Sequence, residues 1–68
     1  MPTITLNGKV TSVPVDVASL ADLLEHLKLA QERVALEQNG SVIPRKLWNE
    51  TSLTADDRIE IVHFVGGG

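Results

Sequence analysis

The sequence predicts an α+β fold in which a mixed β-sheet of four to five strands packs on one helix. Three features predict it. Two Asn-Gly dipeptides, at 7–8 and 39–40, stand between strand-like runs, which is the strongest short-range signal of a β-hairpin. One leucine-rich stretch between them has helical spacing. A run rich in β-branched residues at 58–65 is typical of a final strand.

The first hairpin is predicted from alternation. Ile4 and Leu6 alternate with threonines, which indicates a strand with one buried face. The second strand, 9–15, contains Pro14, and proline has no N–H to donate to a strand ladder. We therefore expect this second strand at an edge of the sheet.

A helix is predicted to begin after Ser19. The Ser19 side chain can cap it, and Asp22 puts a negative charge in the first turn, where the helix dipole favours one. The apolar stripe faces the sheet and consists of Leu20, Leu23, Leu24 and Leu27, while Asp22, Glu25, His26 and Lys28 face water.

The second half predicts short elements and a central last strand. Residues 34–37 form a strand with Val34 and Leu36 inward, 42–43 a brief return strand, 45–48 a single helical turn, and 55–57 a turn. The last strand can then pair parallel to the first in the middle of the sheet. This order is that of the β-grasp, or ubiquitin-like, architecture. A ferredoxin-like fold would need a second long amphipathic helix, and the sequence has none. We predict a β-grasp domain over 1–65 and a flexible tail over 66–68.

Composition excludes several functions. There is no cysteine, so no disulfide, thiolate metal site or cysteine nucleophile is possible. The net charge of −3 and the absence of a basic stripe argue against nucleic acid. His26 and His63 have no ligand-spaced partners, so no metal is expected. With no signal peptide or transmembrane run, we expect a cytoplasmic protein without a membrane partner.

The glycine tail is the main functional candidate. Gly66, Gly67 and Gly68 lack Cβ atoms, so they can thread a narrow channel in a partner. Three extended residues reach about 10 Å, and the Gly68 carboxylate can react once it is activated. The sequence has no phosphate-binding loop of its own, so activation must come from a partner. No catalytic residue is predicted, and the carboxylates, including Asp56 and Asp57, are interpreted as turn and solvated surface.

A docking surface is predicted beside the tail. If Ile59, Ile61 and His63 face the helix, Val62 and Phe64 point to the open side of the sheet and form a small apolar patch there. The alternative is that Phe64 folds over a sheet edge into the core, and a β-bulge would reverse the two faces.

Two segments carry a resemblance to a known family. The stretch 34–48, VALEQNGSVIPRKLW, and the closing segment 53–68 resemble the ThiS sulfur carriers of thiamine biosynthesis. The combination of Pro-Arg-x-x-Trp with a terminal Gly-Gly carries the resemblance, which covers essentially the whole chain. Arg45 and Trp48 match family positions, and we interpret them as packing and orientation residues. Asp56 departs from the family, which usually has Gly there, and we expect a small stability cost because Asp tolerates left-handed turns.

The resemblance implies a carrier rather than an enzyme, with no bound cofactor and a monomeric free state. A ThiF-like adenylyltransferase would use ATP to adenylate Gly68. A sulfur donor such as a cysteine desulfurase would convert it to a thiocarboxylate, and a ThiG-like thiazole synthase would receive the sulfur. The alternatives are the small subunit of molybdopterin synthase, a ubiquitin-like modifier that conjugates to lysines, and a non-catalytic interaction module.

Overall fold

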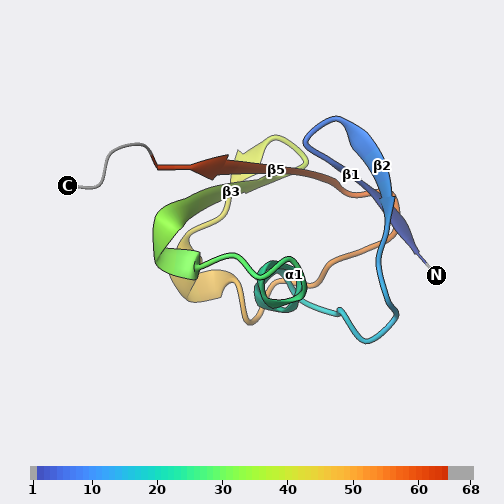
Figure 1. The fold of residues 1–68 in the computed structure, drawn as a ribbon, viewed down its shortest axis with the longest axis horizontal. Helices are drawn as coiled ribbons and strands as arrows, with labels where there is room; N and C mark the ends of the chain where they lie inside the picture. The colour runs from blue at the N-terminus through green and yellow to red at the C-terminus, as the bar shows by residue number, and fades with distance from the viewer. Residues whose placement is uncertain (1, 65–68) are drawn as a thin grey trace.

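The computed structural model describes residues 2–64 and has the predicted β-grasp architecture. The five strands form one mixed sheet in the order β2-β1-β5-β3-β4. Figure 1 shows the single α-helix lying across one face of this sheet. The tail glycines and the predicted domain boundary after residue 65 lie outside the described residues. The elements are β1 (Thr3–Leu6), β2 (Lys9–Ser12), α1 (Leu20–His26), the 3₁₀ turn η1 (Gln31–Arg33), β3 (Val34–Gln38), β4 (Ser41–Val42), the 3₁₀ turn η2 (Arg45–Leu47) and β5 (Arg58–His63).

The last strand occupies the centre of the sheet, as predicted. β5 runs parallel to β1, with Leu6 opposite Ile59, and antiparallel to β3, with Leu36 opposite Ile61. β2 lies at one edge, as the proline predicted, although the strand ends at Ser12 and Pro14 follows it. The short turn η1 before β3 had no sequence signal.

Left-handed backbone occurs where the sequence offers residues that tolerate it. Asn7 and Gly8 have φ values of 48° and 84°, and Asn39 and Gly40 have 52° and 88°. Positive φ at both central residues defines the type I′ turn that suits the twist of a two-residue hairpin. Asp56 has a φ of 70°, so the position where the ThiS resemblance expected Gly is indeed left-handed.

Helix α1 is closed at both ends by hydrogen bonds. The Asp22 N–H donates to Ser19 Oγ over 3.0 Å, and the Asp22 carboxylate accepts from the Ser19 N–H over 3.1 Å, which completes a capping box. The N–H groups of Ala18 and Ser19 lower the pKa of the Asp22 carboxyl. At the other end Lys28 takes a φ of 60°, and the Leu29 N–H donates to the Leu24 carbonyl over 2.9 Å.

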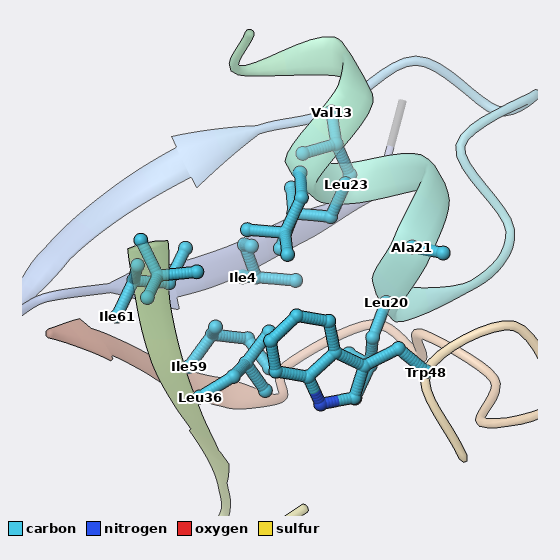
Figure 2. Packing of buried hydrophobic residues seen from close by; sticks show 11 residues of the cluster. Ile4, Val13, Leu20, Ala21, Leu23, Leu36, Trp48, Ile59 and Ile61 are labelled. Carbon is cyan, nitrogen blue, oxygen red and sulfur yellow. The ribbon is translucent and has the colours of Figure 1, made fainter. Parts of the chain in front are cut away.

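The core lies between α1 and the sheet. Figure 2 shows Leu20 and Leu23 of α1 in one cluster with Ile4 of β1, Ile59 of β5, Leu36 of β3 and the Trp48 indole. Trp48 is buried, and its Nε1–H donates to the Ile43 carbonyl over 2.7 Å. The indole therefore acts as a packing residue, as predicted, whereas Arg45 is exposed.

Candidate functional site

β5 ends one residue before Phe64, the last residue that the structure describes. The Phe64 N–H donates to the carbonyl of Arg33, the last residue of η1, over 2.9 Å, so backbone hydrogen bonding continues one residue past the β3–β5 pairing. Gly66, Gly67 and Gly68 follow directly in the sequence but lie outside the described residues. β5 is the central strand: β3 pairs with it from Ile59 to His63, and β1 pairs with it on the other side at Arg58 and Ile59.

Asn7 supports β5 beyond the end of β1. The first strand stops at Leu6, which would leave the Ile61 peptide groups without a partner on that side. Asn7 Oδ1 accepts from the Ile61 N–H over 2.7 Å, and Asn7 Nδ2 donates to the Ile61 carbonyl over 3.2 Å. The side-chain amide therefore takes the place of one further strand residue. The sequence indicated Asn7 only as a turn residue.

Asp57 ties the start of β5 to the turn between β3 and β4. Its carboxylate is 8% exposed and accepts from Asn39 Nδ2 and Gln38 Nε2, each over 2.9 Å, and from the Thr54 N–H over 2.8 Å. Burial alone would raise the pKa of the Asp57 carboxyl, but these hydrogen bonds outweigh it and the pKa lies below its ordinary value. The interpretation of Asp57 as solvated surface was wrong, because a short side chain at the mouth of a turn can point inward to N–H donors.

The two faces of β5 differ as the alternation predicted. Ile59 is 0% exposed under the helix, whereas Val62 and Phe64 are 56% and 64% exposed. The alternative of a core position for Phe64 is therefore wrong, and the described pairing of β3 with β5 runs without a bulge. His63 is exposed at the end of the strand, although it was expected to face the helix with Ile59 and Ile61.

Neighbouring strands extend the apolar surface around Val62 and Phe64. Ala35 is the partner of Val62 across β3 and β5. Ala35, Val42 and Phe64 line one hollow of about 470 Å³ that continues toward Pro44 and Trp48. We call Ala35, Val42, Val62 and Phe64 the apolar patch. Phe64 of this patch is the last residue that the structure describes.

The described residues 2–64 contain neither a metal-binding cluster nor a membrane-spanning helix. No group of three or more His, Cys, Asp or Glu side chains in this range is arranged to hold a metal ion. None of its helices has the length and apolar character needed to cross a membrane.

Comparison with known proteins identifies the family. The sequence model of the ThiS family matches residues 3–68, which includes the tail. This chain belongs to the ThiS family. It is 41% identical over 63 residues to the sulfur carrier protein ThiS of Bacillus subtilis (strain 168), a match that covers 93% of this chain and 96% of that protein.

A second relative is much longer. The chain is 42% identical over 65 residues to a thiazole synthase of Magnetococcus marinus, and the match covers 96% of this chain but 20% of that enzyme. Among solved structures, the crystal structure of ThiS from Geobacter metallireducens superposes with a TM-score of 0.82 at 37% identity, covering 97% of this chain and 99% of that one. The sheet order and single helix described above are therefore those of a known ThiS fold.

Proposed function

We propose that Gly68 is the residue on which this sulfur carrier of thiamine biosynthesis holds its sulfur. The observation that carries the proposal is the family match, because it runs through the last glycine and spans the β-grasp domain together with its tail. The anchoring of β5 on both sides supports it, since a fixed central strand leads directly into the tail.

The proposed chemistry takes place at the C-terminal carboxylate. A carboxylate is a poor electrophile, so a ThiF-like adenylyltransferase attaches it to the α-phosphate of ATP and releases pyrophosphate. The outer sulfur of a persulfide, such as the one on a cysteine desulfurase, then displaces AMP and forms an acyl disulfide. A second thiol attacks the donor's sulfur in that acyl disulfide, so that a disulfide forms and the carrier is released as a thiocarboxylate. Gly66 and Gly67 thread the active site of the partner, because the absence of Cβ atoms keeps the chain thin.

The proposed acceptor is a ThiG-like thiazole synthase. Its support is the Magnetococcus marinus thiazole synthase, in which one fifth of the polypeptide matches this chain. Joining a carrier to its acceptor raises their effective concentration, which is advantageous only when the two proteins act together. Val62 and Phe64 are proposed to contact these partners beside the tail, since both are more than half exposed.

Intact-protein mass spectrometry tests the proposal. The carrier is incubated with ATP, its adenylyltransferase and a sulfur source. We expect a mass increase equal to replacing one oxygen by sulfur, confined to the C-terminal peptide that ends in Gly68. An unchanged mass, with an adenylyltransferase proven active on another carrier, would overturn the proposal. Product assays then separate thiazole formation from molybdopterin formation.

Lengthening the tail gives an independent test. A chain with one alanine added after Gly68 should not be adenylated, because the reacting carboxylate is displaced by one residue from the site that activates it. Pyrophosphate release, measured with the extended and the unextended carrier side by side, reads this out. Equal rates for the two chains would show that Gly68 is not the reacting residue.

A further inference from the structure

Two like charges lie side by side on the open face of the sheet. Glu37 of β3 is the direct partner of Glu60 of β5. The Cβ atoms of directly opposed residues in an antiparallel pair are about 5 Å apart, and like charges in such a pair are destabilising. Arg58 is the nearest cation along the same face of β5, two residues before Glu60.

The glutamate pair borders the apolar patch. Val42 of β4 is opposite Glu37, and Val62 follows Glu60 on the same face of β5. Both valines are exposed. The open face therefore presents two adjacent carboxylates at the margin of an uncovered apolar surface, an arrangement that complements a cationic side chain set among apolar residues on another protein.

We propose that the adenylating enzyme docks on this open face and places an Arg or Lys side chain between Glu37 and Glu60. This inference rests on the proposed function and names the contact that the partner makes. The charge argument favours this partner: an enzyme that brings the phosphates of ATP to a carboxylate needs cationic groups around that site. The carrier has a formal net charge of −3, which is of the opposite sign to those cationic groups.

The position of the pair along β5 fits such a partner. Glu60 is four residues before Phe64, or about 14 Å along an extended strand. Ala35, Val62 and Phe64 of the apolar patch follow the carboxylates over that interval, and Val42 lies beside Glu37. A partner that holds the tail in its active site and reaches back over Phe64 and Val62 therefore arrives at the glutamate pair.

The test is a kinetic comparison of Glu37→Gln, Glu60→Gln and the double variant. Adenylation is followed by pyrophosphate release at increasing carrier concentration, in low and in moderate salt. For the double variant we expect a KM for the carrier at least tenfold above that of the unmodified chain, with unchanged kcat. The salt dependence of KM should also be largely lost. The melting temperature should stay the same or rise, because the repulsion between the carboxylates is removed.

Glu25→Gln is the matched control. Glu25 is exposed on α1, which covers the opposite face of the sheet, and the substitution changes the net charge as much as either single glutamate variant does. An unchanged KM in the double variant, an equal rise in the control, or a fall in melting temperature that accompanies the rise would overturn the inference. A defect confined to sulfur transfer to thiazole synthase would also overturn it, because it would assign the face to another partner.

Adenylation of the unmodified carrier distinguishes a failure of the proposed function from a failure of the docking contact alone. If it is not adenylated by an enzyme proven active on another carrier, the proposed function fails and this inference falls with it. If it is adenylated and the glutamate variants behave identically to it, only the docking contact is wrong.

Discussion

One face of β5 is buried against the helix, whereas the other face of the same strand is exposed to solvent. Toward α1 the strand presents Ile59 and Ile61, which belong to the core cluster around the helix leucines. Toward the open side it presents Glu60 and Val62, both exposed, and the exposed Phe64 follows directly after the strand. Because successive side chains of a strand point to opposite faces, one six-residue element both holds the fold together and offers a surface beside the tail. The contrast separates residues that stabilise the core from alternate residues that remain exposed.

The largest loss of stability is expected from a substitution on the buried face of β5. Ile59→Ala should lower the free energy of unfolding by about 3–4 kcal/mol, because it removes buried methyl groups and leaves a cavity under the helix. Val62→Ala, on the exposed face, should lower the free energy of unfolding by less than about 0.5 kcal/mol. Urea denaturation measures both. Ile59→Val should fall between them at about 1 kcal/mol, and equal losses on the two faces would refute the contrast.

Asp57→Asn is expected to have the next largest effect, about 2 kcal/mol, since the variant loses charge-assisted hydrogen bonds from Asn39, Gln38 and the Thr54 N–H. The folded-state pKa of Asp57 is lowered. Its contribution to stability is therefore present above the unfolded-state pKa of about 3.9 and is lost as the pH falls through the folded-state pKa.

Denaturation at several pH values checks this sign. The difference in unfolding free energy between the unmodified chain and Asp57→Asn should be constant near neutral pH and shrink in strong acid. Asp56→Asn serves as a control, because Asp56 is exposed at the neighbouring position and Asn also tolerates its left-handed backbone. A difference that grows in acid would contradict the assignment.

A smaller effect is expected at Asn7, which supports β5 from the side. Asn7→Gly should cost about 1–2 kcal/mol, because glycine keeps the positive φ but removes both hydrogen bonds to Ile61. Hydrogen exchange of the Ile61 amide should accelerate more than that of Leu36 in the paired strand. Unchanged exchange at Ile61 would show that the side-chain amide does not support the strand.

The sequence predicted the helix and the strands better than it predicted the hydrogen bonds through which Asn7 and Asp57 support β5. Alternation in β1 and β5, the leucine spacing of α1 and the two Asn-Gly turns are local patterns, and each predicted the correct element. The roles of Asn7 and Asp57 depend on contacts 54 and up to 19 residues away in the chain, and no local pattern records those contacts. The Glu37–Glu60 pair likewise needs the register between β3 and β5.

The smallest effect on stability, and a clear effect on binding, is expected at Phe64. Phe64→Ala should change the free energy of unfolding by less than about 0.5 kcal/mol, because the ring is 64% exposed. Binding to the adenylating enzyme should weaken by at least fivefold in calorimetric titration, since the ring supplies much of the apolar patch beside the tail.

Val10→Ala is the matched control: Val10 is an exposed residue of β2, at the edge of the sheet farthest from β4. If Phe64→Ala unfolds the domain, the ring stabilises the native state and the open face is not a separate surface. If both variants bind like the unmodified chain, the tail alone holds the partner, and the contrast between the two faces of β5 carries no recognition.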